Sequence, residues 1–477
     1  MSFVNNKPSI NMTITGFGQA GTRMADCFAA IKDGQEYVYN TLALNSNDGD
    51  LQELKYIPRD NRVSLNLGGL GKNPTKAMAI LENDEPVREK LKSFITQSIR
   101  PKDELVLFSA GLGGGTGTST LVRALEEFYD FNNKPKIIEE LKKIQAETSA
   151  ADFKANLEKY KVQAFKRAQE RFVKIGVVVT LPVRSDGPDV LRQVNEFADR
   201  IWRAAKNPAK GIAFVIFADN QYFYDRWKEL GPNAKADNYR DYANREICNL
   251  IHELNTGTNG GGTSVTFDSQ DFRRIILEGT GSLVISKDSK KVEEINNVND
   301  LKGLFTSALD NNSLHDPIAL QETDESGVTK FAKVHHVGLL GVLDNQLKSM
   351  GSSFLDEAKN EIIEKLPLSG TVFSGYLQDK HDFRVSAYTF YKVEALPQRL
   401  AKGLVKEYEE FVQKQKAVSY REDSIAKIAV ADDENLDLDL DLSELGIDMA
   451  EIEAAATKEE DEGIDLDNLN FDGIDLD

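Results

Sequence analysis

A glycine-rich run is the feature of this sequence whose residue types most directly suggest chemistry. Residues 111–120 read GLGGGTGTST and follow an apolar stretch, Leu105–Ser109, that predicts a buried strand. Glycine costs conformational entropy on folding, so such a run indicates a place where backbone N–H groups converge on an anion. The helix expected from Thr118 adds the positive end of its dipole, and the hydroxyls of Thr116 and Thr118 add donors. The pattern therefore predicts a phosphate-binding loop.

A second glycine turn, GFGQAG at residues 16–21, also follows a predicted strand and opens a helix. On its own it matches GxGxxG, the fingerprint of dinucleotide-binding folds. That alternative is weakened because such a fold needs an acid at the tip of the second strand, where this chain has Asn45-Ser46-Asn47. The sequence contains no GxxxxGK[ST], which excludes a P-loop NTPase on motif grounds.

Buried strands and helices must hold these loops in place. Continuous apolar runs separated by helices indicate a parallel sheet covered on both faces. Strands are expected at Asn11–Thr15, Tyr37–Leu44, Leu105–Ser109, Ile175–Thr180 and Ile212–Phe217, and helices at Ala20–Ile31, Val87–Ile99 and Thr118–Tyr129. A long central helix is expected at Asn238–Leu254, strands of a second domain at Gly281–Ser286, Val334–Leu343 and Phe383–Val393, and a final helix at Leu400–Val418.

The composition excludes several classes of protein. A chain of 477 residues with 40% hydrophobic residues is not wholly disordered. Its two cysteines, Cys27 and Cys248, exclude a disulfide framework and a cysteine-rich metal site, and they favour a reducing cytoplasm. No apolar run approaches the roughly 18–20 residues that span a bilayer, and the first residues lack the pattern of a secretory signal. The histidines show no zinc-ligand spacing.

Nearly all of the net charge of −19 lies at the C-terminal end. Residues 432–477 contain 19 acids and one base, a net charge of −18, so the other 431 residues carry only −1. This crowding of like charge predicts a disordered tail. Gly-Ile-Asp recurs three times in it, at Gly446, Gly463 and Gly473. The regular apolar residues suit docking on a basic, apolar groove, and the alternative is a solubilising tail that binds nothing.

A basic segment interrupts the alternation of strands and helices. Lys134–Lys174 holds 11 basic and 6 acidic residues, a net charge of +5. It predicts two charged helices, broken near Thr148–Ala151, that leave the domain and return to its sheet. Two interpretations stay open: a solvated protrusion, or a contact surface for a neighbouring subunit, for DNA or for the acidic tail.

The GGGTGT loop resembles the signature of the tubulin/FtsZ superfamily of GTPases, with Ser119 where the usual motif has glycine. Other segments resemble the family's nucleotide loops in the same order: GFGQAG, Asn45–Asn47, Gly68–Pro74, Thr180–Pro182 with Asp186-Gly187, Asp219-Asn220, and Asn244 on the central helix. The resemblance implies that the nucleotide is bound by Gly18, Gln19, Ala20, Gly21, Arg23, Asn45, Asn47, Gly71, Lys72, Asn73, Gly113, Gly114, Gly115, Thr116, Gly117, Thr118, Pro182, Asp186, Asn220 and Asn244. Arg23 stands near the position where many members have a guanine-facing Asn.

The segment Thr266–Phe272 resembles the family's synergy loop, NxDxxD, with Thr266 in place of the Asn. The resemblance implies that Asp268 and Asp271 are catalytic and complete the site of the next subunit by orienting the attacking water. They follow a helix of about 17 residues, roughly 25 Å long, which separates them from the phosphate loops. The alternative is that Asp268 only caps the helix after it.

The resemblance is nearest to the TubZ and phage-tubulin branch. It implies an α/β fold: a Rossmann-like GTPase domain with a parallel sheet, a long central helix, a second α+β domain, a C-terminal helix and a disordered acidic tail. The expected divisions are an N-terminal extension (1–10), a GTP-binding domain (11–237) with a helical insertion (134–174), the central helix (238–256), a C-terminal domain with the synergy loop (257–398), a C-terminal helix (399–421) and the tail (422–477).

The implied function is a GTPase that polymerises head-to-tail into dynamic filaments, for plasmid segregation or positioning of phage DNA. GTP or GDP and Mg²⁺ are the expected ligands, the metal being held mainly by the nucleotide phosphates. The tail is expected to bind a basic adaptor such as a DNA-binding protein. Neither membrane binding nor direct nucleic-acid binding is expected, and the location is the cytoplasm of a bacterial host cell. The alternatives are an FtsZ-like cell-division GTPase and a static nucleotide-bound scaffold.

Overall fold

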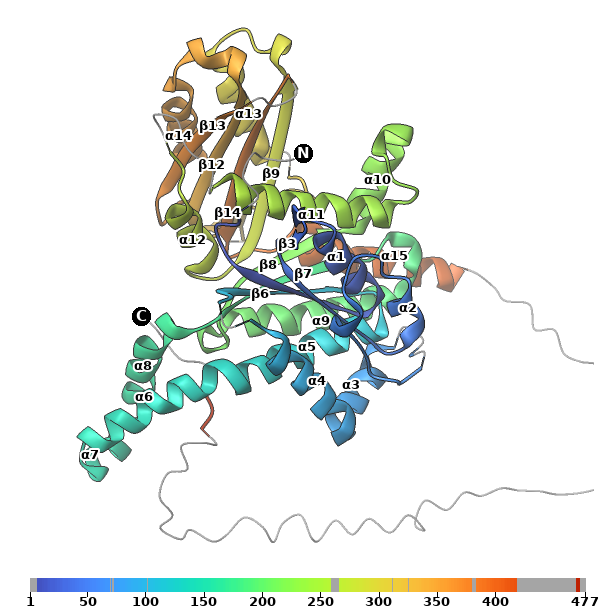
Figure 1. The fold of residues 1–477 in the computed structure, drawn as a ribbon, viewed down its shortest axis with the longest axis vertical. Helices are drawn as coiled ribbons and strands as arrows, with labels where there is room; N and C mark the ends of the chain where they lie inside the picture. The colour runs from blue at the N-terminus through green and yellow to red at the C-terminus, as the bar shows by residue number, and fades with distance from the viewer. Residues whose placement is uncertain are drawn as a thin grey trace, which may run out of the picture.

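A single ten-stranded sheet organises the molecule (Figure 1). The computed structural model describes residues 7–68, 70, 73–100, 102–258, 266–310, 312–324, 326–379, 383–417 and 469–471. The strand order is β13-β12-β14-β9-β8-β7-β6-β1-β4-β5. Its strands are β1 (Met12–Phe17), β4 (Asn40–Asn45), β5 (Arg62–Ser64), β6 (Leu105–Gly111), β7 (Lys174–Leu181), β8 (Ile212–Asp219), β9 (Ser282–Lys291), β12 (Val334–Asp344), β13 (Val372–Asp379) and β14 (Arg384–Val393).

The six neighbouring strands β5, β4, β1, β6, β7 and β8 are all parallel and lie between two layers of helices. One face of the sheet shares a core with α1 (Gly18–Ala29), α11 (Tyr239–Gly257) and α12 (Ser269–Leu277). The other face shares a core with α4 (Glu85–Ser98), α5 (Gly115–Phe128), α9 (Pro188–Lys206) and the start of α15 (Leu404–Ala417). The expected parallel sheet covered on both faces is confirmed.

The strands expected in a second domain continue the same sheet. β9 joins β8 through a single parallel pair, Ser282 with Val215, and β14 and β12 then continue antiparallel. These strands form a separate core with α13 (Val298–Asp310) and α14 (Ser353–Lys365). The two parts of the chain therefore have separate hydrophobic cores, but their strands belong to one continuous hydrogen-bonded sheet.

Several boundaries differ from those expected. The strand expected from Tyr37 begins at Asn40, because Glu36-Tyr37 (β3) pairs with Lys32-Asp33 (β2) in a small exposed hairpin. The final α-helix begins at Leu404 and is preceded by one π-helical turn at Arg399–Gly403. The remaining short elements are α2 (Asp48–Gln52), α3 (Pro74–Asn83), α10 (Asn220–Leu230), β10 (Gln321–Thr323) and β11 (Thr329–Phe331).

The basic insertion forms three helices that project from the body (Figure 1). These are α6 (Lys134–Glu147), α7 (Ala150–Ala155) and α8 (Leu157–Ala168). Ser149 caps α7 at the break that the sequence predicts, and Asn156 makes a second break. The expected tail lies outside the described residues except for Leu469–Phe471. None of the described helices is both long enough and apolar enough to span a bilayer.

Candidate nucleotide-binding site

A cavity of about 430 Å³ lies at the carboxyl end of the parallel strands, where ligands bind in open α/β sheets. Its volume is within the range of small-molecule sites. Residues from both glycine loops and from α11 line it. It brings together ten of the residues predicted to bind the nucleotide: Gln19, Ala20, Arg23, Gly113, Gly114, Gly117, Pro182, Asp186, Asn220 and Asn244.

The first turns of α1 and α5 leave hydrogen-bond donors at this cavity. Their N-cap residues, Phe17 and Gly114, make no side-chain hydrogen bond to the helix. By contrast, an Asn or Asp side chain caps each of α2, α3, α4, α10, α11 and α12. First-turn N–H groups need a partner outside the helix, and the N-terminus favours negative charge. Side-chain caps are also absent from α6, α8, α9 and α14, but α1 and α5 begin in the two glycine loops at the cavity, so their N-termini form a site suited to phosphate.

The two glycine loops touch each other through their backbones. A Cβ on Gly18 would lie 2.6 Å from the amide nitrogen of Gly117, and Gly18 has φ = +65°, which favours glycine. A Cβ on Gly117 would lie 2.8 Å from the carbonyl oxygen of Phe17. The loops that the sequence shows separately thus form one continuous cradle.

Gly21 has a different role. A Cβ there would lie 2.1 Å from the carbonyl oxygen of Ser109, so its absence allows α1 to pack directly on β6. The structure therefore places Gly21 in a contact between helix and sheet, away from the residues that line the cavity. Its contact with the nucleotide stays a prediction.

Several predicted residues shape the wall without lining the cavity. The hydroxyl of Thr118 is buried and donates to the carbonyl oxygen of Gly114 at 2.7 Å, and its contact with the nucleotide stays a prediction. The hydroxyl of Thr116 donates to Ser46 Oγ at 2.9 Å. Asn45 donates to Asp50 at 2.9 Å, and Asn47 caps α2. Nucleotide contacts by Thr116, Asn45 and Asn47 stay a prediction.

Asn73, from the segment Gly68–Pro74, lies next to the cradle. A Cβ on Gly115 would lie 3.0 Å from the amide nitrogen of Asn73, so the two backbones are close. The Asn73 side chain caps α3, accepting from the amide of Lys76 at 2.9 Å. The predicted residues Gly71 and Lys72 lie outside the described residues.

The end of the cavity away from the glycine loops is built on α11. Asn244 is 6% exposed, and its side-chain amide makes no hydrogen bond to another described residue although it lines the cavity. Buried amides normally have partners, so Asn244 is suited to reading a polar ligand. Arg23, on α1, also lines the cavity and forms an ion pair with Glu53 at 2.8 Å.

Tyr239 and Arg240 also line this end, and the sequence analysis missed them. The Arg240 guanidinium lies 4.7 Å from the centre of the Tyr239 ring. Either flat group can stack on a base. The signal was present in the sequence: Arg240 precedes Asn244 by four positions, which puts both on one face of the central helix.

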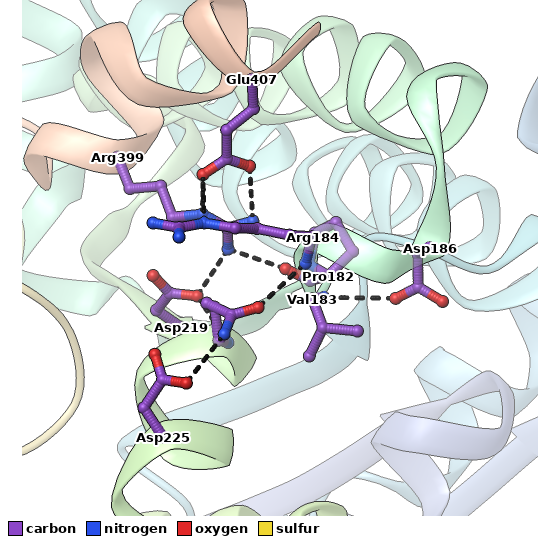
Figure 2. A network of polar contacts seen from close by, with 9 residues as sticks. Pro182, Val183, Arg184, Asp186, Asp219, Asp225, Arg399 and Glu407 are labelled. Atoms are coloured by element: carbon purple, nitrogen blue, oxygen red, sulfur yellow. Dashed lines mark hydrogen bonds and ion pairs between the residues drawn. The ribbon is translucent and has the colours of Figure 1, made fainter. Parts of the chain in front are cut away.

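A buried arginine, Arg399, supports the loop that follows β7 and contains Pro182 (Figure 2). Arg399 Nη1 donates to the Pro182 carbonyl oxygen at 2.7 Å and to Asp219 Oδ1 at 2.6 Å. Its other nitrogens donate to Glu407 of α15 at 3.0 and 2.9 Å. Burial raises the pKa of Asp219, and the charge of Arg399 opposes that rise. Arg399 thereby ties the cavity wall to the C-terminal helix.

Helix α12 lies beyond the C-terminal end of α11, and Asn244 belongs to the N-terminal half of α11 (Figure 1). Asp268 is the N-cap of α12, and Asp271 lies in its first turn. Asp268 is exposed and caps α12: its Oδ1 accepts from the amides of Gln270 and Asp271 at 2.8 and 2.9 Å. Burial and the nearby Asp268 charge raise the pKa of Asp271. The capping role is therefore present, and neither carboxylate reaches the cavity of its own chain.

Comparisons with known proteins agree with this geometry, although no family model matches the chain. Two proteins called tubulin-like protein TubZ, from Bacillus cereus and Bacillus anthracis, are each 23% identical over 368 residues, 73% of this chain and 73% of theirs. The GTPγS-form protofilament structure of TubZ from Bacillus thuringiensis serovar israelensis has a TM-score of 0.62 at 18% identity, covering 86% of this chain and 93% of that one. Over most of its length the chain is similar to tubulin-like proteins, in agreement with the expected resemblance to the tubulin/FtsZ superfamily.

Within the superfamily, the sequence similarity that spans most of the chain is to TubZ proteins. The tubulin-like protein CetZ of Thermococcus kodakarensis is more similar, 36% identical, but over 125 residues, 24% of this chain and 30% of that protein. The GDP-bound monomer of CetZ1 from Haloferax volcanii has a TM-score of 0.54 at 17% identity and covers 85% of this chain and all of that one. The expected placement beside TubZ is confirmed.

Proposed function

We propose that this protein is a GTPase that polymerises head-to-tail and hydrolyses GTP at the junction between subunits. The observation that carries the proposal is the separation of two half-sites along α11. One half is the cradle of helix N-termini with Asn244, and the other half is the exposed Asp268 with the partly buried Asp271.

The length of α11 supports a shared site. Its 19 residues span about 28 Å at 1.5 Å per residue. An aspartate side chain cannot cover that distance within its own subunit, whereas a second copy stacked on the cavity would bring its carboxylates to the phosphates. Contacts between unlike faces do not close on themselves, so they generate open filaments. The TubZ structures include protofilaments and two- and four-stranded filaments.

The proposed ligands are GTP and GDP with Mg²⁺. In phosphoryl transfer, the protein clamps the phosphates, neutralises their charge and orients the attacking water. The cradle would supply the clamp, Asn244 would read the base, and the carboxylates of the adjoining subunit would orient the water. Mg²⁺ would be held mainly by phosphate oxygens, as is common in nucleotide sites.

The biological role that we propose is segregation of plasmid DNA or positioning of phage DNA. One similar structure is described as a type III plasmid segregation TubZ. In this role the acidic C-terminal segment would bind a basic adaptor such as a DNA-binding protein, in the cytoplasm of a bacterial host. Copurification of such an adaptor with the full chain, and not with a chain ending at residue 431, would test this part.

The decisive experiment separates the charge of Asp268 from its capping role. Asn caps helices as well as Asp does, so Asp268→Asn should leave α12 intact while removing the carboxylate. We expect the variant to bind GTP and sediment with GTP, to release phosphate about 10²-fold or more slowly, and to form over-stable filaments.

The matched control is Asp84→Asn, because Asp84 is also an exposed aspartate that caps a helix, α4. It should hydrolyse GTP normally. Phosphate release per wild-type molecule should also rise with protein concentration as polymer forms. A wild-type rate in Asp268→Asn, or full turnover in dilute unpolymerised protein, would overturn the shared site. Disassembly that needs no hydrolysis would favour the static scaffold.

A further inference from the structure

The far C-terminal end of the chain contacts the helical insertion. Phe471 is 1% exposed and lies in an apolar cluster that helices α6 to α8 form together with Tyr129, Phe172 and Ala209. Leu469 packs against the same cluster. Figure 1 shows this short segment in red beneath α6. Complete burial of a phenylalanine is one of the larger single contributions that an apolar side chain makes. The contact therefore indicates a built docking site.

The insertion has an apolar surface that suits such an anchor. Ile137, Ile138, Leu141 and Ile144 form a stripe along α6, and Phe165 of α8 faces the same cluster. Two helices packed side by side leave part of each apolar stripe uncovered. Phe471 enters this cluster from outside the insertion and completes it.

The charges of the two segments are complementary. The insertion, 134–174, has a net charge of +5, whereas residues 463–477 contain five aspartates and no basic residue. Opposite charge guides two surfaces together and favours the correct partner, while the apolar anchors fix the position. The opposite charge attracts the acidic segment to this surface, and burial of the Phe471 ring determines the position at which it binds.

The connecting chain is long enough for the contact to form within one molecule. Residues 418–468 separate the end of α15 from Leu469, a length of 51 residues. Fully extended, such a chain spans up to roughly 170 Å. A compact body of this size has a radius of gyration of about 22 Å. No second copy is required to bring the tip to the insertion.

We propose that the helical insertion is the docking site of this chain's own C-terminal tip, with Phe471 as the main anchor and Leu469 as the second. The acidic segment is then held to the body at both of its ends. A basic partner that binds the tip must displace it from α6 and α8, so docking controls access to the acidic segment. This role is independent of GTP hydrolysis.

Hydrogen–deuterium exchange of the full chain tests the proposal. Phe471→Asp should speed exchange in α6, in α8 and around residue 471 by about tenfold or more, because the docked state is lost. Phe471→Leu keeps an apolar anchor and should retain most of the protection. Leu442→Asp introduces the same residue elsewhere in the acidic segment and should leave the exchange rates of α6, α8 and the region around residue 471 unchanged. Unchanged exchange in β7 and β8 shows that the body is folded.

Two results would overturn the proposal. Equal exchange in wild-type protein and Phe471→Asp would show that the tip does not dock. Protection that disappears on dilution of the wild-type chain would assign the contact to a second copy. Protection that is independent of concentration and lost only in Phe471→Asp supports docking within the molecule.

Discussion

Replacing Asn244 by alanine should weaken GTP binding without destabilising the fold. Asn244 is buried on α11, lines the cavity, and makes no hydrogen bond to another described residue. Its amide therefore contributes little to the ligand-free protein. If it reads the base, its contribution arises only in the complex.

The expected size follows from the bonds that one amide can make. A side-chain amide offers a donor and an acceptor to a base, and each hydrogen bond contributes about 0.5–1.5 kcal/mol net. Loss of two such bonds costs about 1–3 kcal/mol, or roughly a 5- to 150-fold rise in Kd. Isothermal titration with GTP and with ATP would measure both the loss and any change of base preference.

A second asparagine on the same helix provides the matched control. Asn255 is fully buried, and its amide accepts from the backbone N–H of Ile10 at 2.8 Å and donates to the Ile10 carbonyl oxygen at 3.0 Å. Asn255→Ala leaves two buried backbone groups unpaired, each costing about 1–3 kcal/mol. It should lower the unfolding free energy with little effect on Kd. Asn244→Ala with unchanged Kd, or with a loss of stability like that of Asn255→Ala, would refute the reasoning.

Two further predictions concern stability. Burial lowers the pKa of both His252 and His315 to about 4. The unfolded chain therefore binds more protons than the folded chain between pH 6.5 and pH 4. The unfolding free energy should fall as the pH is lowered through that window, by up to about 3 kcal/mol for each imidazole. An unfolding free energy from urea titrations that does not change with pH would contradict this. Arg399→Met breaks a buried charge network and should cost about 3–5 kcal/mol and weaken GTP binding. The control is Lys402→Met, which breaks an exposed ion pair and should cost less than about 1 kcal/mol. Equal denaturation midpoints for the two variants would show that Arg399 does not stabilise the cavity wall.

The sequence was sufficient to locate the phosphate cradle because its signal is local. A buried strand, a glycine run and a helix follow one another within the 24 residues Leu105–Phe128. Each of these elements is determined by neighbours in the chain, and the helix N-terminus fixes where an anion binds. Asn244 was predicted differently, from the resemblance of its helix to the family's central helix, and the structure places it at the same cavity.

Contacts between distant segments could not be read in the same way. The hydroxyl of Thr118 was expected to face an anion, and only the folded loop shows that it donates a hydrogen bond to the Gly114 carbonyl oxygen. The Arg399 network joins residues about 180 positions apart through Asp219. Likewise, one pair between Ser282 and Val215 extends the sheet into the second core. Local patterns carry no information about such pairings.

The capping geometry of α12 clarifies what the composite site requires. An aspartate that caps a helix is held in one orientation, and both capping bonds of Asp268 go to a single oxygen, Oδ1. The cap therefore positions the carboxylate without consuming its charge, and burial with the Asp268 charge raises the pKa of its neighbour Asp271. Capping and catalysis are therefore compatible explanations of the same residue: the cap would fix the carboxylate in a mobile interface, and a stacked subunit would give it a water to orient.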